Sequence, residues 1–178
     1  MKSNTQKLVR ASLLLAIAIA FQIIGRNLPE INQFLVGPVI NCILILTVLL
    51  CDKWHGVAVG ILTPLLAWFV GQLAAPLAPF IPFIIVGNFL FVYVFSLYSK
   101  GKLVKRSFGI IIAALFKYGF LAISATKLIN VFNLGFPPKI ASALAVSMGS
   151  PQLITAVTGG ALALILITVL EKRKFKFE

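Results

Sequence analysis

Polar side chains at five positions interrupt long apolar stretches, and their types suit the binding of a small molecule. They are Lys117, Asn88, Gln152, Asn41 and Thr155. Polar groups in hydrocarbon persist only where they pair with one another, with the backbone or with something in a cavity. These residues lie at similar depths, and the other halves of the stretches are almost purely apolar. The pattern therefore predicts a cup that is open to the outside and has a closed floor.

Lys117 is the most informative of the five. It lies eleven residues after Arg106, a helical rise of about 16 Å that reaches the middle of a hydrocarbon core about 30 Å thick. A lysine at the bilayer centre costs about 2.5–3.5 kcal/mol. It could contact a carboxylate or another anionic or carbonyl oxygen of a ligand. It could also be satisfied by helix carbonyls, Asn88 or buried water, although the usual functional role of charges within a membrane favours the ligand contact.

The remaining candidates also have two interpretations. Asn88 and Gln152 could bind a ligand or form interhelical hydrogen bonds. Gln152 and Thr155 open the last apolar stretch. Asn41 shares their depth, although Asn41 and Thr63 each lie near a proline that disturbs the helix, which favours a structural role for both.

Six apolar stretches are long enough to cross a bilayer, at residues 8–24, 34–51, 54–70, 80–98, 108–125 and 151–170. The chain is 60% hydrophobic and has a mean hydropathy of +1.05. We predict an all-α integral membrane protein of six transmembrane helices that forms one domain over residues 1–178. A break at residues 133–138 (NLGFPP) leaves residues 139–148 as a short helix at the outer surface.

The distribution of cations predicts the orientation. With the N-terminus inside, twelve of the 16 lysines and arginines lie on the inner side, three lie outside and Lys117 lies within a span. The positive-inside bias then places both termini in the cytoplasm of a multi-pass protein of the cell membrane. The inner cations are Lys2, Lys7, Arg10, Lys53, Lys100, Lys102, Lys105, Arg106, Lys172, Arg173, Lys174 and Lys176, and the outer ones are Arg26, Lys127 and Lys139.

Several function classes are disfavoured by composition. The net charge of +12 is explained by anionic lipid headgroups at the inner face, so we expect no nucleic-acid partner. The four acids, Glu30, Asp52, Glu171 and Glu178, lie at span ends or in loops. Proton or sodium coupling through a carboxylate within the membrane is therefore not expected. We also expect no metal site, no cofactor, no ATP-binding loop and no catalytic residue, so the protein is not predicted to be an enzyme.

Aromatic residues crowd the outer boundary of the third and fourth stretches. Trp68, Phe69, Phe80 and Phe83 are interpreted as an interfacial belt rather than as a box that stacks on a ligand.

A strip of small residues marks the first stretch, where Ser12, Ala16 and Ala20 recur every four residues. Such a strip lets another helix approach closely in lipid. On spacing alone, packing within the chain is the favoured interpretation.

These features together resemble the substrate-binding S components of energy-coupling factor (ECF) transporters. The resemblance rests on the six-span pattern, the AxxxA motif of residues 16–20 (AIAIA), and the segments 79–88 (PFIPFIIVGN) and 150–156 (SPQLITA). It covers nearly the whole chain.

The resemblance implies an outward cup that binds a vitamin or similar micronutrient. It also implies docking, through the small-residue face of the first helix, onto a membrane T component driven by two cytosolic ATPases. Ala16 and Ala20, with Ser12 in the same strip, then map to the docking face. Asn88, Lys117 and Gln152 lie where ligand contacts are expected.

Lys117 favours an acid such as pantothenate, nicotinate, biotin or lipoate over a neutral base. Two other classes remain as alternatives. A small ion-coupled transporter would need a titratable carboxylate in the membrane, and a structural membrane subunit would not retain a small molecule.

Overall fold

The computed structural model describes residues 4–28 and 32–172, which form helices and turns without a strand. The long helices are α1 (Asn4–Arg26), α2 (Asn32–Leu50), α3 (Lys53–Phe69), α4 (Ile81–Ser96), α5 (Leu103–Ile123) and α8 (Ser150–Lys172). The short ones are the 3₁₀-helix η1 (Ala75–Phe80), the π-helix η2 (Ser124–Leu128), α6 (Ile129–Val131) and α7 (Pro138–Ser147). The all-α prediction is confirmed. Lys2, Glu30, Arg173, Lys174, Lys176 and Glu178, which entered the charge argument, lie outside the described residues.

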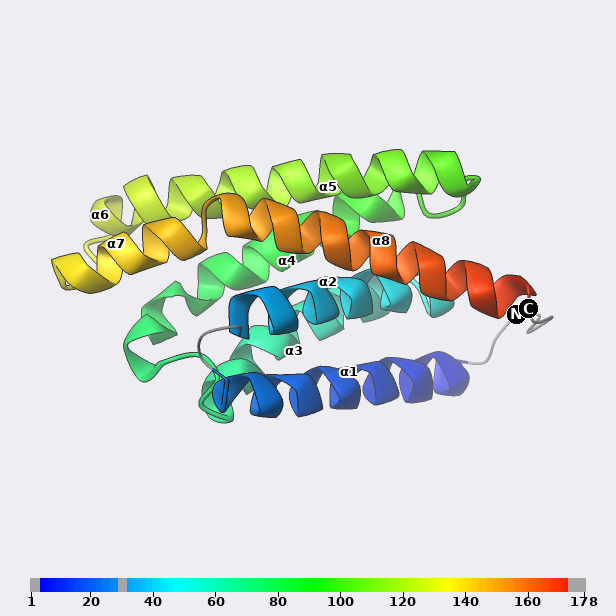
Figure 1. Ribbon diagram of the computed structural model, residues 1–178, viewed down its shortest axis with the longest axis horizontal. Coiled ribbons are helices and arrows are strands. Elements are labelled where there is room, and N and C mark those ends of the chain that lie inside the picture. Colours follow the sequence, from blue (N-terminus) through cyan, green and yellow to red (C-terminus); the bar gives the residue numbers. More distant parts are fainter. Residues whose placement is uncertain (1–3, 29–31, 173–178) are drawn as a thin grey trace.

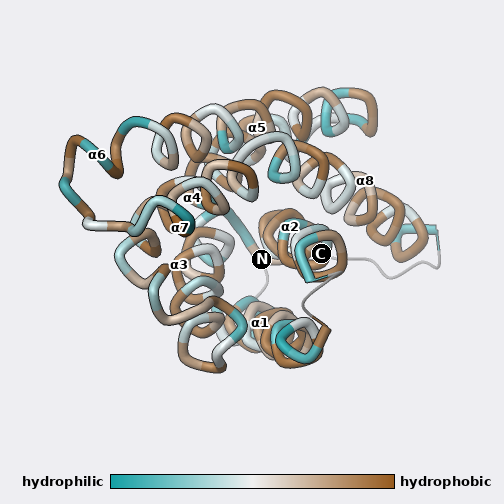
Figure 2. The backbone as a smooth tube through the Cα atoms, turned by 60° about the vertical axis from the view of Figure 1, so that its left-hand side comes forward, coloured by the Kyte–Doolittle hydropathy of each residue, from teal (hydrophilic) through white to brown (hydrophobic). Residues whose placement is uncertain are grey.

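The long helices run side by side in one elongated bundle (Figure 1). The start of α1, the end of α8 and the connection from α4 to α5 lie at one end, and η1, α6 and α7 lie at the other. Helix α2 is central and packs against α1, α3, α4 and α8. Apolar residues dominate along the long helices (Figure 2).

Five helical stretches among the described residues are long and apolar enough to cross a membrane. They are Asn4–Arg26, Asn32–Leu50, Ala75–Ser96, Leu103–Val131 and Pro138–Lys172. Helix α3 has 17 residues, at the lower limit for a transmembrane helix. The lengths and apolar surfaces of these helices are those of a multi-pass membrane bundle.

The helix that contains the fifth predicted stretch, residues 108–125, is longer than that stretch. Helix α5 begins at Leu103 and continues through η2 and α6 to Val131, because a helix extends past the apolar run by which the sequence identifies it. In the π-helical part, the hydroxyls of Ser124 and Thr126 donate to the carbonyls of Phe120 and Ala122 at 2.7 and 2.8 Å. Such bonds satisfy carbonyls where the regular helical ladder changes.

A charged cluster joins the beginning of α1 to the turn before α3. Asp52 caps α3 by accepting hydrogen bonds from the backbone N–H groups of Trp54 and His55, and it also pairs with Lys7 at 3.1 Å and with the His55 ring at 2.9 Å. Burial raises the pKa of this carboxyl, but the bonds from His55 and Lys7 outweigh burial and lower the pKa to about 2. The stabilisation from the ionised group is therefore present above its usual pKa of 3.8 and is lost as the pH falls through about 2.

Helices α2 and α8 approach closely because glycine lies at their contact. A methyl group at Gly159 would overlap the carbonyl oxygen of Pro38 and lie 2.7 Å from Asn41 Cβ. Gly159→Ala should therefore destabilise the protein by about 1–3 kcal/mol, the usual cost of overpacking. Gly119→Ala in α5 is the matched control, since nothing lies within 4 Å of its added methyl group. Thermal unfolding in detergent should separate the two variants, and equal melting temperatures would contradict this packing.

Candidate functional site

A cavity of about 380 Å³ lies at the end of the bundle that carries η1 and α7. Helices α1, α2, α3, α4, α5 and α8 all contribute residues to it, together with the segment before α4 and the end of α7. Its polar lining consists of Gln22, Asn32, Gln33, Asn41, Thr63, Gln72, Asn88, Lys117, Ser147 and Gln152. Three of the five candidates from the sequence, Lys117, Asn88 and Asn41, meet in direct contact there.

Lys117 is the cation of this cavity and is only 4% exposed. Its Nζ donates to Asn41 Oδ1 at 2.7 Å and to Asn88 Oδ1 at 2.8 Å, and it lies 5.3 Å from the centre of the Phe91 ring. An ammonium group has three N–H donors, so these two bonds leave one for a further acceptor. The internal bond to Asn88 is confirmed, and Lys117 also lines the cavity. The two interpretations of this lysine are thus compatible.

Asn88 is held in place by the proline in α3. Pro64 has no N–H, so the carbonyl of Gly60, four residues earlier, loses its helical partner. Asn88 Nδ2 donates to that carbonyl at 2.9 Å, and Gly60 has no side chain to keep α4 away. With its amide nitrogen bound in this way, Asn88 must present its oxygen to Lys117. The helix break in α3 therefore orients a residue of the site.

Asn41 is oriented from within its own helix. Its Nδ2 donates to the carbonyl of Gly37 at 2.9 Å, which leaves Oδ1 for Lys117. The side chain is 2% exposed. Asn41 therefore has both roles: it is hydrogen-bonded within its own helix, and it holds Lys117 in the site.

Gln22 of α1 was missed as a site residue. It is 3% exposed, and its Nε2 donates to the carbonyl of Thr63 at 3.0 Å. Its Oε1 is buried and has no hydrogen-bond partner among the described residues. The signal was available in the sequence, because Gln22 is a polar residue inside the first apolar stretch, as Asn41 is inside the second.

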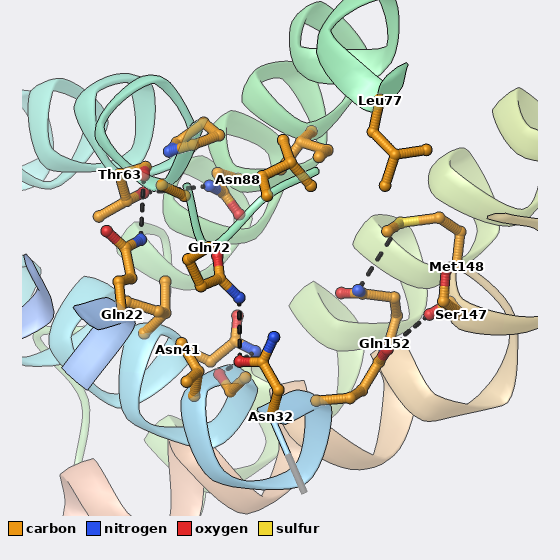
Figure 3. A pocket seen from close by; sticks show the side chains of 18 of the residues that line it. Gln22, Asn32, Asn41, Thr63, Gln72, Leu77, Asn88, Ser147, Met148 and Gln152 are labelled. Carbon is orange, nitrogen blue, oxygen red and sulfur yellow. Dashed lines mark hydrogen bonds between the residues drawn. The ribbon is translucent and has the colours of Figure 1, made fainter. Parts of the chain in front are cut away.

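A second group of amides also lines the cavity, and Figure 3 shows two of them, Gln72 and Asn32, between Gln22 on one side of the view and Gln152 on the other. Gln72 Nε2 donates to Asn32 Oδ1 at 3.0 Å, and Gln33 Nε2 donates to the carbonyl of Ser147 at 2.8 Å. These bonds tie the beginning of α2 to the segment before η1 and to the end of α7. The sequence did not identify these amides because they lie at helix ends and in a connection.

The two candidates on α8 differ in position. Gln152 lines the cavity, and its Nε2 has only a weak acceptor, the sulfur of Met148 at 3.7 Å. Thr155 is 1% exposed and does not line the cavity. Its methyl group lies against Gly37 of α2, and its hydroxyl donates to the carbonyl of Gln152.

The aromatic residues at the outer boundary divide into two groups. Trp68 and Phe69 are 44% and 83% exposed, as a belt requires. Phe80 is fully buried and stacks on Phe83 with ring centres 5.1 Å apart, so the belt interpretation is wrong for Phe80. The reason is that η1 folds back and buries this ring beneath α7 and η2.

The strip of small residues on α1 faces away from the bundle. Ser12, Ala16 and Ala20 are exposed, whereas Ala11, Ala18, Gln22 and Gly25 form the buried face. Packing within the chain, the interpretation favoured from spacing, is therefore wrong. The strip is free to meet lipid or another protein.

Among the residues that the structure describes, this site has no candidate metal ligands and no acid. The described residues contain no group of three or more His, Cys, Asp or Glu side chains that could hold a metal ion. The described residues that line the cavity include no aspartate or glutamate. Among the described residues, the hydrogen-bond partners of Lys117 are thus the neutral side chains of Asn41 and Asn88.

Comparison with known proteins gives one match. The family model for the substrate-specific component of the ECF transporter matches residues 6–171. No curated protein and no solved structure matches the chain.

Proposed function

Because the chain belongs to the family of substrate-specific components of ECF transporters, we propose that it binds an anionic, vitamin-like micronutrient in the cavity around Lys117. Members of this family are substrate-binding subunits of transporters rather than enzymes. The observation that carries the proposal is a buried lysine with neutral partners in a cavity of about 380 Å³. Burying an uncompensated charge is costly, and an anionic ligand would supply the missing countercharge.

The geometry around Lys117 suits a carboxylate. Asn41 and Asn88 fix the ammonium group from two sides, so a ligand oxygen would complete its hydrogen bonds without rearrangement. Preorganised donors of this kind bind with a smaller loss of conformational entropy. A structural subunit would not need such a cavity, and an ion-coupled transporter would need an acid that the described lining lacks.

Transport is proposed to depend on partners. A membrane T component would dock against Ser12, Ala16 and Ala20 of α1, and two cytosolic ATPases would drive release of the ligand. The exposed face of these small residues supports this assignment, because small side chains let two helix backbones approach closely in lipid.

We further propose six spans in the cell membrane with both termini in the cytoplasm. Helix α3, the third in chain order, would cross the membrane in addition to the five longer stretches. The described cations support this orientation, since Lys7, Arg10, Lys53, Lys100, Lys102, Lys105, Arg106 and Lys172 belong to the ends and connections on one side of the bundle. A cavity at the opposite end would then open to the outside.

Labelling of single cysteines tests this topology. In a protein lacking Cys42 and Cys51, Leu103→Cys should resist an impermeant thiol reagent in intact cells and react after lysis. Asn133→Cys, in the connection before α7, should react in intact cells. Labelling of position 103 from outside would contradict the orientation.

Reconstitution tests the transport role. Proteoliposomes holding this chain, a T component and two ATPases should take up the ligand only when ATP is present, whereas the chain alone should bind the ligand without accumulating it. Accumulation by the chain alone would contradict the proposed dependence on partners.

A further inference from the structure

We infer that the ligand is an aliphatic carboxylate whose chain carries amide, ureido or hydroxyl groups, rather than an aromatic acid or a plain fatty-acid-like one. This inference rests on the proposed function and narrows the ligand class of the same cavity.

The first observation is that the cavity has no aromatic wall. None of its described lining residues is Phe, Tyr or Trp, although the chain contains 15 Phe. Phe80 and Phe83 stack on each other, and Phe91 lies next to Lys117 without lining the cavity. Recognition of a flat ring usually relies on aromatic stacking partners, and this lining offers none.

The second observation is that the apolar part of the lining is aliphatic. It includes Val36, Ile40, Ala67, Leu73, Leu77 and Ile84, together with Pro64, Ala74 and Met148. Branched side chains of this kind pack well against the methylene and methyl groups of a saturated chain. A ligand held here would bury a flexible aliphatic body rather than a planar one.

The third observation is a set of side-chain amides whose polar atoms are only partly used. Gln22 Oε1 is buried and has no partner among the described residues, and Nε2 of the half-buried Gln152 has only the sulfur of Met148. Leaving a buried polar atom such as Gln22 Oε1 without a partner is unfavourable. A ligand with donors and acceptors along its chain would satisfy them, whereas a hydrocarbon chain would leave them unpaired.

Neither of these amides is hydrogen-bonded to Lys117. Lys117 is bonded to Asn41 and Asn88, and Figure 3 shows Gln22 and Gln152 on opposite sides of the view. The ligand should therefore carry its carboxylate and its amide or hydroxyl groups at different points along its chain. The volume of about 380 Å³ is near the lower end for small-molecule sites.

Binding to the purified chain tests this with five probes. Pantothenate and biotin are aliphatic acids with amide or ureido groups, lipoate is an aliphatic acid without them, nicotinate is an aromatic acid, and pantothenol is a neutral counterpart of pantothenate. We expect pantothenate or biotin to bind at least about 10-fold more tightly than lipoate and nicotinate. Gln152→Leu should reduce that advantage by roughly 10-fold while leaving lipoate unaffected. Thr158→Val, on the exposed face of α8, should change nothing.

The outcomes separate the inference from the proposed function. Nicotinate or lipoate binding as tightly as the polar aliphatic acids, in a manner that depends on Lys117, would overturn the inference and leave the proposed function standing. Pantothenol binding as tightly as pantothenate, or acids binding equally well to Lys117→Met, would overturn the proposed function itself. Failure of all five probes to bind more tightly than about 1 mM would overturn the inference.

Discussion

Lys117→Met should reduce ligand affinity by about 2–5 kcal/mol, the usual loss when one partner of a buried charge pair is removed. Methionine keeps much of the side-chain length and removes the charge. Because Lys117 is the only cation that lines the described cavity, no neighbouring group can replace it. Calorimetry or equilibrium dialysis with the purified protein measures the change.

The same substitution should leave the fold nearly as stable as before. It strips a hydrogen-bond donor from Asn41 Oδ1 and Asn88 Oδ1, at a cost of about 1–3 kcal/mol each. It also removes a buried cation that costs about 2.5–3.5 kcal/mol in the membrane. The two effects roughly cancel. A variant that binds normally but melts much earlier would assign Lys117 to structure alone, and Lys127→Met, at an exposed lysine, is the matched control.

Replacing both Ala16 and Ala20 with leucine should abolish uptake and recovery of a T component, while ligand affinity stays within about twofold of the parent protein. Leucine would hold apart two helices whose backbones must approach closely. The exposure of both alanines means that the larger side chains disturb no contact within the chain, so the fold should be unaffected.

Ala161→Leu is the control for this double variant. It places the same side chain at an exposed alanine on α8, on another helix of the bundle. Co-purification and uptake should survive it. If the α1 variant still recovers the T component in full, the docking face lies elsewhere.

The sequence predicted the helical class and the residues at the deep end of the cavity well. Lys117, Asn88 and Asn41 are costly in hydrocarbon, so their presence in apolar stretches indicated that they need hydrogen-bond partners. In the structure Lys117 is hydrogen-bonded to both asparagines. Their geometry was less predictable. Asn88 is oriented by the carbonyl of Gly60, which lacks a helical partner because of Pro64. This contact requires a close approach of α4 to Gly60, and spacing along the sequence does not reveal that approach.

The other amides show where sequence reasoning stops. Asn32, Gln33 and Gln72 lie at helix ends or in a connection, where polar residues are expected and carry no signal. They gather only because η1 and α7 fold over the end of α2. The strip on α1 illustrates the same limit, since a spacing of four identifies a helix face but does not say whether that face packs inside or outside the bundle.

Native mass spectrometry of the purified protein tests the central claim most directly. The protein released gently from detergent should carry a small molecule whose mass and fragmentation identify an acid, and Lys117→Met prepared in parallel should have lost it. A bound molecule that is neutral or basic, or an acid retained equally by Lys117→Met, would contradict the assignment of this cavity to an anionic ligand held by Lys117.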